Sequence, residues 1–354
     1  MRICYLAHTL NPKTGAGVFT ENLVSGIRAQ SKGAEFSVLT SENHIKPDLL
    51  GFLKNLPHVR ARFREADIVH ALDGYPYGVV AALANLGISK PLVITAVGSG
   101  SVGLLRQSGL KTELLKWAYQ KADKVTAISR YVANEIRNVL PNLSIEVVNH
   151  GVDADFFKPL GTKENDAPYI VTQGEFKRRK GYSEILPIMK KIMDKKPELK
   201  YVIVADTGRN KEYQMELQLL LRTLDIEDRV VIKSSLNREK LRETYQRASL
   251  YLSLPKNVLG DVEGFGLSIL EAAACGVPAV VGRGSGADDA VSDGRSGFLM
   301  DGSDEKKIVE KILSILDNKD LHLELSLGAR KWAEENVWAT KTRTYLKLYE
   351  KIQS

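Results

Sequence analysis

The sequence lacks several features that would narrow its function class. It has only two cysteines in 354 residues, Cys4 and Cys275, both in apolar segments far apart, so we expect reduced, buried thiols and no disulfide framework. No apolar run approaches the roughly 20 residues that a membrane-spanning helix needs. The apolar start, MRICYLAH, is too short for a signal peptide and is typical of a first β-strand.

Motifs for nucleic-acid and metal binding are also missing. We find no helix-turn-helix, zinc-finger or RNP pattern, and no histidines and cysteines with the spacing of zinc ligands. The net charge of +7 is a mild excess that fits a phosphorylated ligand or an anionic membrane face, and equally a solvated surface. We expect a cytoplasmic protein with no nucleic-acid partner, and peripheral contact with the inner face of a membrane stays an open alternative.

Short β-type segments alternate with amphipathic segments along the chain. The alternation runs from RICYLAH to IEVVNHG, stops at the polar stretch FFKPLGTKENDAP, and starts again at YIVTQG. Such alternation predicts parallel sheets with helices on both faces. We therefore predict an α/β fold of two Rossmann-like domains, residues 1–160 and 161–335, facing each other across a cleft, followed by a helix over 336–354.

The segment 263–281, EGFGLSILEAAACGVPAVV, places two glutamates eight positions apart around a predicted helix start. Glu271 falls among leucine and alanine residues, where a buried carboxylate is costly unless donors surround it. The first amides of the helix are free and favour an anion. They belong to Gly266, Leu267 and Ser268. This arrangement predicts a nucleotide-sugar site, and the alternative is a solvent-facing Glu271 with Glu263 as a helix cap.

Five segments resemble, in the same order, those of family 4 glycosyltransferases of the GT-B fold. They are TGAGVFTENLVSGI, ADKVTAISRYV, VNHGVDADFFKP, GEFKRRKGYSEIL and the E-x7-E helix that runs through GVP to DGRSGFLM. The resemblance covers nearly the whole chain. It implies transfer of a sugar, with retention of configuration, from a nucleoside-diphosphate sugar to a hydroxyl of a glycan or lipid-linked acceptor. The expected donor is a UDP-sugar, with a GDP-sugar as the second choice. It implies no obligatory metal, an acceptor-binding N-terminal domain, a donor-binding C-terminal domain, and a last helix that packs back on the first domain.

The resemblance also implies roles for single residues. Gly15 and Gly17 would let the backbone approach the donor diphosphate, and Lys180 would balance the charge of the leaving diphosphate. Glu271 would accept ribose hydroxyls, and Glu263 would hold hydroxyls of the transferred sugar, so Glu263 and Lys180 are the predicted catalytic residues. Further donor contacts are predicted at Arg179, Gly264, Phe265, Gly266, Leu267 and Ser268.

Two positions depart from the family pattern. The family usually has His before the glycine of the loop in PLVITAVGSG, where this chain has Val97. It often has Arg after the first glycine of GEFKRRKG, where this chain has Glu175. A carboxylate beside a diphosphate is unfavourable unless it points away, and Arg178 or Arg179 is placed to supply the missing charge. A catalytically weak homologue that binds a sugar nucleotide is therefore the alternative function.

Other motifs have competing interpretations. Residues 98–103, GSGSVG, fit a dinucleotide-binding pattern, but they follow the fourth predicted strand rather than the first and lack an acidic partner at the expected offset. Asp153-Ala-Asp155 has metal-ligand spacing but falls in a segment typical of a turn. His70, Gly98 and His150 are candidate acceptor or cleft contacts, and a structural role explains either histidine equally well.

The segment 109–124 is amphipathic and basic. Lys111, Lys116, Lys121 and Trp117 are candidates for contact with an anionic membrane face, and a packed helix with a solvated face is the alternative. A two-lobed solute-binding protein also has paired α/β domains, but we expect such a protein to carry a signal peptide.

Overall fold

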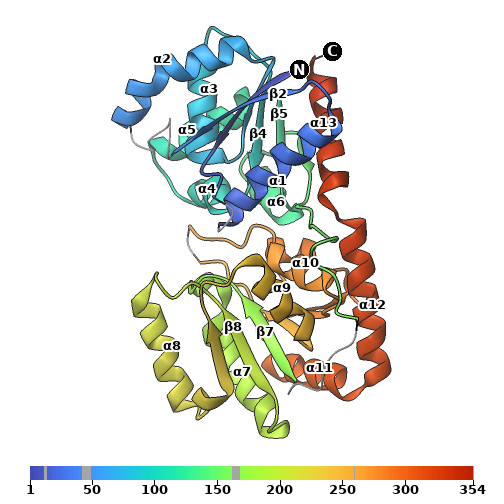
Figure 1. The fold of residues 1–354 in the computed structure, drawn as a ribbon. Helices are drawn as coiled ribbons and strands as arrows, with labels where there is room; N and C mark the ends of the chain where they lie inside the picture. The colour runs from blue at the N-terminus through green and yellow to red at the C-terminus, as the bar shows by residue number, and fades with distance from the viewer. Residues whose placement is uncertain (12–13, 42–48, 162–167, 259, 354) are drawn as a thin grey trace. The chain divides into compact units, whose positions relative to one another are not determined.

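The computed structural model describes residues 1–11, 14–41, 49–161, 168–258 and 260–353, with the backbone alone for 49–53 (Figure 1). The chain divides into two compact units. The first comprises Met1–Gly151, Leu259–Phe265 and Trp338–Ser354, and the second comprises Val152–Val258 and Gly266–Val337. The observed division after Gly151 precedes the predicted one at residue 160, and a short segment from the second half of the chain joins the first unit.

Six parallel strands form the sheet of the first unit, in the order β2-β1-β3-β4-β5-β6. The strands are β1 (Arg2–Ala7), β2 (Glu35–Thr40), β3 (Ile68–Ala71), β4 (Leu92–Ala96), β5 (Lys124–Ala127) and β6 (Ile145–Val147). The helices are α1 (Gly15–Gln30), α2 (Leu49–Glu65), α3 (Val79–Asn85), α4 (Ser99–Val102), α5 (Leu110–Lys121), α6 (Arg130–Arg137) and α13 (Trp338–Gln353). The winding reverses between β1 and β3, and open parallel sheets bind ligands beyond the strand ends at such a reversal.

The second unit repeats this plan with the order β12-β11-β10-β7-β8-β9. The strands are β7 (Tyr169–Gln173), β8 (Lys200–Val204), β9 (Val230–Lys233), β10 (Leu250–Ser253), β11 (Ala279–Gly282) and β12 (Gly297–Met300). The helices are α7 (Tyr182–Lys195), α8 (Lys211–Thr223), α9 (Arg238–Arg247), α10 (Leu267–Ala274), α11 (Glu305–Asp317) and α12 (Lys319–Glu335). The winding reverses between β7 and β10, and the predicted class, two Rossmann-like α/β units, is confirmed.

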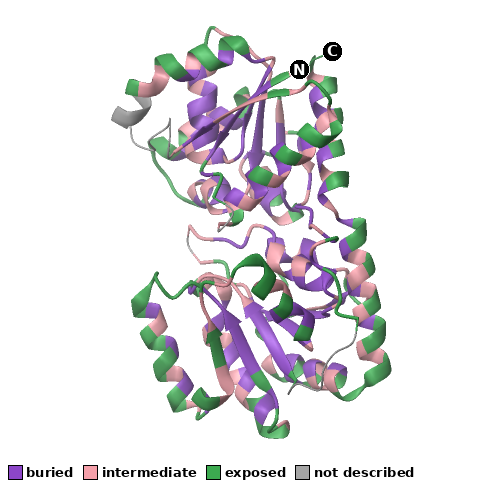
Figure 2. Ribbon diagram, viewed as in Figure 1, coloured by how far each residue is buried: buried purple, intermediate pink, exposed green. Residues whose placement is uncertain are grey.

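Helices cover both faces of each sheet. In the second unit the chain moves outward from β7 through α7 and α8 and returns through α9 and α10. Right-handed crossovers therefore put these two pairs on opposite faces. The strands between such layers are apolar on both sides, as in β1, where every residue after Arg2 is buried (Figure 2).

The last helix, α13, packs in the first unit beside α1, as the resemblance implies (Figure 1). Gly26 permits the close approach, because a Cβ there would lie 2.5 Å from Cγ2 of Thr342. Tyr345, Leu348 and Tyr349 of α13 enter the same buried cluster as Tyr5 of β1. The final residues of the chain thus complete the core of the first unit.

Candidate active site

The winding reversal of the second unit is organised around Gln173, the last residue of β7. Its backbone N–H donates to the Tyr251 hydroxyl at 3.1 Å, and that hydroxyl lies 2.7 Å from Oγ of Ser268 in the first turn of α10. Its side-chain oxygen accepts a hydrogen bond from the Tyr245 hydroxyl of α9. Polar groups from β7, β10, α9 and α10 therefore meet at the carboxyl end of the sheet.

Glu271 joins this group from the middle of α10. Its carboxyl group is partly buried and hydrogen-bonded to Tyr245 rather than turned into bulk solvent. Loss of water around it raises the pKa of Glu271 to about 7, against the opposing effects of the positive charge of Arg238 and the bond to Tyr245. The arrangement excludes the alternative of an ordinary solvent-facing glutamate.

The start of α10 has the geometry expected of an anion site. Gly266 caps it with a left-handed φ of +84°, and a Cβ there would meet Cδ1 of Ile269 at 2.8 Å. The amides of Leu267 and Ser268 lie in the first turn, where an α-helix leaves its N–H groups without intrahelical partners.

Lys180 lies across the glycine that follows β7. A Cβ at Gly174 would be 2.7 Å from Cε of Lys180 and 3.2 Å from its Nζ, so a side chain there would displace the end of the lysine. Gly181, with φ of +70°, lets this loop lie against the residue after β10, because a Cβ would be only 1.9 Å from the carbonyl oxygen of Leu254. The amide of Lys256 donates to the carbonyl of Arg179 at 2.8 Å. The two loops at the reversal are therefore joined, and Lys180 belongs to the loop that follows β7.

The neighbouring charges separate the two candidate arginines. Arg178 is paired with Glu216 at 2.7 Å and stacks on Tyr213, with its guanidinium carbon 4.9 Å from the ring centre. Glu175 forms ion pairs with Lys177 at 2.7 Å and Arg209 at 3.4 Å. These lysine and arginine charges lower the pKa of Glu175, although partial burial opposes them. Arg178 is thus committed elsewhere, and the candidate charge beside Lys180 is Arg179.

Asp153 has a structural role. Its Oδ1 accepts the amide of Phe156 at 3.1 Å, and its Oδ2 pairs with Arg238 at 3.2 Å. This is the turn expected for Asp153-Ala-Asp155. Among the described residues, no group of three or more His, Cys, Asp or Glu side chains is arranged to hold a metal ion.

In the first unit, the predicted glycines near the start of α1 differ in what surrounds them. A Cβ at Gly15 would meet nothing within 4 Å, so that side of the backbone is open. A Cβ at Gly17 would lie 1.9 Å from the carbonyl oxygen of Asn11. The packing of the chain itself therefore requires Gly17, independently of any ligand.

The Leu259–Phe265 segment, counted with the first unit, brings Glu263 to the end of β4. Glu263 is 8% exposed, and a Cβ at Gly264 would be 2.5 Å from the carbonyl oxygen of Val97. Gly98, with φ of +149°, lies against Gly264. The side chain of Val97 packs on the buried cluster of the first unit, so it offers no polar group where the family usually has histidine.

His70 is not a ligand contact, which corrects one predicted role. It is fully buried, with Nδ1 2.6 Å from the Tyr349 hydroxyl and Nε2 2.7 Å from Oγ1 of Thr95. Burial lowers its pKa to about 3, so it is neutral at physiological pH. The contact with α13 joins residues 279 positions apart.

His150 lies in an aromatic cluster rather than on an open surface. Its ring centre is 4.7 Å from that of Phe19, 5.3 Å from Phe265 and 5.7 Å from Trp338. Burial lowers its pKa to about 3, and in the described part of the chain its Nδ1 has no hydrogen-bond partner. His150 therefore supports Phe265, next to Glu263, and is itself 7% exposed.

Asp73, two residues after the end of β3, was not among the predicted site residues. Its Oδ1 accepts hydrogen bonds from Oγ of Ser101 at 2.6 Å and from the amide of Gly74 at 2.7 Å. Loss of water raises the pKa of Asp73 to about 7, although both hydrogen bonds oppose this. The available signal was an aspartate and a glycine immediately after a buried strand.

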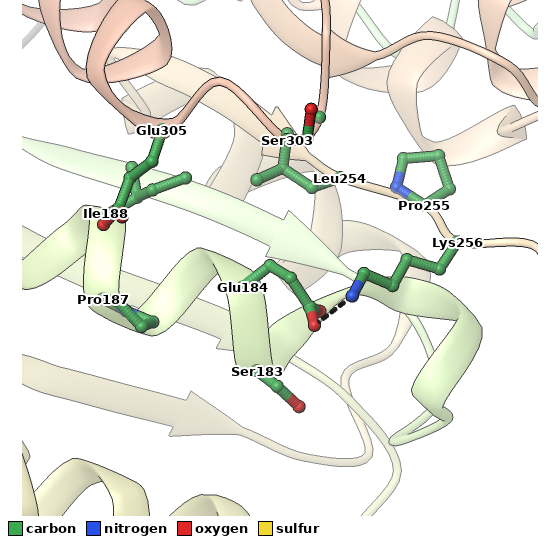
Figure 3. A pocket seen from close by; sticks show the side chains of 10 residues that line it. Ser183, Glu184, Pro187, Ile188, Leu254, Pro255, Lys256, Ser303 and Glu305 are labelled. Atoms are coloured by element: carbon green, nitrogen blue, oxygen red, sulfur yellow. Dashed lines mark hydrogen bonds and ion pairs between the residues drawn. The ribbon is translucent and has the colours of Figure 1, made fainter.

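A pocket of about 400 Å³ lies beside α7 in the second unit (Figure 3). The first two turns of α7, the loop that follows β10 and the segment that leads into α11 line it, and Lys256 forms an ion pair with Glu184 at its edge (Figure 3). Glu271 is not among the lining residues. The pocket is therefore separate from the cluster around Gln173.

Two six-stranded Rossmann-like units define the GT-B class of glycosyltransferases, and solved structures share the architecture. Anabaena HepE, crystallised with UDP and glucose, superposes with a TM-score of 0.79 at 19% identity, over 99% of this chain and 100% of that one. A glycosyltransferase from Rickettsia africae gives 0.82 at 17% identity, over 99% and 98%.

Family models match most of the chain. The model for group 1 glycosyl transferases covers residues 153–332, and the model for glycosyltransferase family 4 covers residues 14–156. The chain belongs to these glycosyltransferases.

Two curated relatives are enzymes with named substrates. A GDP-mannose-dependent alpha-(1-6)-phosphatidylinositol monomannoside mannosyltransferase of Mycolicibacterium smegmatis is 28% identical over 81% of this chain and 78% of its own. An N-acetyl-alpha-D-glucosaminyl L-malate synthase of Bacillus anthracis is 25% identical over 79% and 73%. No helix in the described residues is both long and apolar enough to cross a bilayer.

Proposed function

We propose that this glycosyltransferase moves a sugar, with retention of configuration and without an obligatory metal, from a nucleoside-diphosphate sugar to a hydroxyl acceptor. The observation that carries the proposal is the hydrogen-bonded cluster of Gln173, Tyr245, Tyr251, Ser268 and Glu271 at the winding reversal of the second unit. It surrounds a carboxylate that the fold makes harder to ionise, as expected of a functional group rather than a stabilising one.

Each part of the donor has a candidate partner in this unit. The ribose hydroxyls donate to Glu271, and the diphosphate accepts hydrogen bonds from the first amides of α10 and from Lys180 and Arg179. As the bond to the sugar breaks, negative charge builds on the diphosphate, and a lysine held beside it lowers the barrier. An oxygen of the leaving phosphate takes the proton of the acceptor hydroxyl.

Glu263 is the proposed partner of the transferred sugar. Its loop is held at the end of β4 by contacts of Gly264 with Val97 and Gly98. Because Val97 offers no polar side chain, hydrogen bonds to the sugar at this position fall to Glu263 and the backbone. Orientation of the sugar rather than acid–base chemistry is then the main contribution of the first unit.

The donor is proposed to be a UDP-sugar first and a GDP-sugar second. HepE was crystallised with UDP and glucose, and the mycobacterial relative is named for GDP-mannose. A hexosyl or N-acetylhexosaminyl group fits both relatives' names.

The acceptor is proposed to be a glycan or a lipid-linked hydroxyl compound, which the enzyme meets at the cytoplasmic face of a membrane. Helix α5 carries the basic residues of the proposed contact. Leu110 at its start is 76% exposed, and Lys111 and Lys121 are exposed as well. Lys116 is paired with Glu113 at 2.8 Å and contributes less free charge.

The first experiment is a thermal-shift screen against UDP, GDP, ADP and TDP sugars, because a ligand that binds only the folded state raises the melting temperature. The wild type should respond to one nucleotide series. Glu271→Ala should lose that response, whereas Glu263→Ala should keep the response to the nucleotide and lose transfer. Equal shifts for wild type and Glu271→Ala would refute the assignment of Glu271.

The second candidate function is a sugar-nucleotide-binding homologue with little or no transfer activity, which Val97 favours. Release of nucleoside diphosphate from the donor that shifts the melting temperature separates the two. Release above the rate without protein supports transfer, and binding without release supports the alternative.

A further inference from the structure

Donor binding does not explain the glycine- and serine-rich segment 98–103. In the first unit this segment forms the turns around α4, at the carboxyl end of β4. Each of its serines binds a carboxylate from a different loop. Oγ of Ser99 donates to Oδ1 of Asp261 at 2.7 Å, and Oγ of Ser101 donates to Oδ1 of Asp73 at 2.6 Å.

The two oxygens of Asp73 are in different situations. Oδ1 accepts two hydrogen bonds, from Ser101 and from the amide of Gly74. Ser101 is itself fixed, because its Oγ accepts the amide of Val97 at 2.9 Å. No described residue donates a hydrogen bond to Oδ2, and the side chain is partly exposed. One oxygen is thus held by the protein while the other is left for a ligand.

Glycines make room for this carboxylate. A Cβ at Gly100 would lie 2.5 Å from Oδ2 of Asp73 and 2.8 Å from the carbonyl oxygen of Tyr75. A Cβ at Gly74 would lie 2.3 Å from the Tyr119 hydroxyl, which donates to the carbonyl of Ser101 at 2.8 Å. The pattern G-S-G-S therefore serves the placement of Asp73, not the binding of a dinucleotide.

The position of Asp73 within the unit suits a ligand. It follows β3, at the reversal of winding between β1 and β3, where open parallel sheets bind ligands. The same short segment contacts the Glu263 loop at its other end, through Gly98 and Gly264. Only one turn of helix, about 5 Å of rise, separates these two contacts along the segment.

We propose that Oδ2 of Asp73 binds a hydroxyl group of the acceptor, and that the acceptor presents neutral hydroxyls rather than a phosphate at this point. The inference rests on the proposed function and adds the acceptor side to it. An ionised carboxylate accepts hydrogen bonds from hydroxyl groups and repels phosphate, so the assays below are run at pH 8, above the pKa of Asp73 of about 7. Ser101 and Gly100 are positioning residues for Asp73.

The test measures nucleoside-diphosphate release from the donor found by thermal shift. It uses water alone, then glycerol and methyl α-glucoside, and then their phosphorylated counterparts glycerol 3-phosphate and glucose 6-phosphate. The neutral compounds should accelerate release by the wild type more than the phosphorylated ones. Asp73→Asn should lower kcat/KM for the neutral acceptor about ten- to a hundredfold, the effect of losing a hydrogen bond to a charged group, with the donor KM and the release to water unchanged.

Two further variants separate positioning from charge. Gly100→Ala keeps the carboxylate but displaces it, so it should reproduce the loss in acceptor kcat/KM. Asp67→Asn removes a carboxylate at the opposite end of β3, where Asp67 pairs with Arg2 at 3.3 Å, and should leave all rates unchanged. Circular dichroism checks that each variant folds. If Gly100→Ala does not fold, the result for Asp73→Asn alone tests the proposal, because asparagine keeps both hydrogen bonds to Oδ1.

Several results would overturn the inference while leaving the proposed function intact. One is an Asp73→Asn variant with the acceptor kcat/KM of the wild type, and another is a variant whose donor KM changes as much as its acceptor kcat/KM. The others are that neither neutral compound accelerates release, or that the phosphorylated compounds accelerate it more. A wild type that neither binds nor cleaves any donor would instead reject the proposed function, and this inference with it.

Discussion

The first and second units wind six strands in the same way, yet they use buried polar side chains differently. In the first, α13 brings Tyr349 to His70 inside the core, and Thr95 completes the partners of the imidazole. In the second, Tyr245 and Glu271 of the covering helices gather at the carboxyl end of β7. Burial disfavours the charged form of both His70 and Glu271. Their positions differ, because His70 is enclosed by the core, whereas Glu271 lies near the carboxyl ends of the strands, where open parallel sheets bind ligands.

The two units also have something in common. Each holds one carboxyl group with a pKa raised to about 7 near its reversal of winding, Asp73 in the first and Glu271 in the second. Asp73 is on the loop that follows β3, whereas Glu271 is inside α10, the helix that follows β10. Shared topology fixes the neighbourhood of a site, and the local sequence decides which residue serves it.

The largest effect should come from Lys180, which tests whether the second unit binds the donor. Lys180→Ala should lower kcat by about 100- to 1000-fold, because charge develops on the leaving diphosphate only in the transition state. Arg178→Ala is the matched control and should change kcat by less than about threefold, since Arg178 forms an exposed pair with Glu216. Steady-state release of nucleoside diphosphate measures both, and equal losses would contradict the separation of the two residues.

His70 tests the structural half of the comparison. His70→Leu should reduce the free energy of unfolding by about 2–4 kcal/mol, because it removes the two buried hydrogen bonds of the imidazole, to the hydroxyls of Tyr349 and Thr95. Nucleotide affinity should not change, since the proposed nucleotide site is in the second unit. Urea unfolding and calorimetric titration measure the two quantities. Exposed His58 provides a control substitution on α2. A loss of nucleotide affinity without a loss of stability would reverse the assignment.

The raised pKa values predict that both carboxylates oppose folding at neutral pH. The folded state holds each proton more tightly than the unfolded state, so the contribution to stability is full below the unfolded pKa, 3.8 for Asp73 and 4.5 for Glu271, and is lost as pH rises through about 7. The free energy of unfolding of Asp73→Asn and of Glu271→Gln should therefore rise relative to that of the wild type between pH 5 and 8, by up to about 3 kcal/mol each. Urea unfolding at the two pH values checks this. If the difference in free energy of unfolding between variant and wild type does not increase with pH, the prediction is wrong. An increase in only one variant would mean that only one of the two units holds a carboxyl group with a raised pKa.

The smallest effect should come from Glu175. Glu175→Gln should change nucleotide affinity by less than about threefold, because the carboxylate already pairs with Lys177 and Arg209 at the surface. Calorimetric titration with the nucleotide is the measurement. A gain of tenfold or more would mean that Glu175 faces the diphosphate.

The fold was predictable because its signals are local. Each strand and helix shows its own apolar period, and the order of the segments then sets the class. Glu271 was predictable for the same reason, as a carboxylate inside an apolar helix. The cluster around Glu271 was not, because its partner Tyr245 bonds to Gln173, which lies 72 positions away and comes close through the pairing of β7 with β10.

The predicted roles of His70 and Gly17 were limited in the same way, by contacts that the local sequence does not show. His70 ends a strand, and the sequence around it fits a ligand contact and a structural residue equally well. Its partner Tyr349 comes from the other end of the chain. Gly17 was predicted to serve a ligand, and the contact that the structure shows there is with the backbone of Asn11. A glycine pattern shows that something comes close and does not show what.

The polypeptide passes between the two units four times, after Gly151, Val258, Phe265 and Val337. Neither unit can consequently be produced by cutting the gene at one point. A fragment ending near residue 160 would lack Tyr345 and Tyr349 from its interior and Glu263 from the end of β4. A separately expressed first half therefore needs α13 supplied, by fusion or as a peptide, before it can fold.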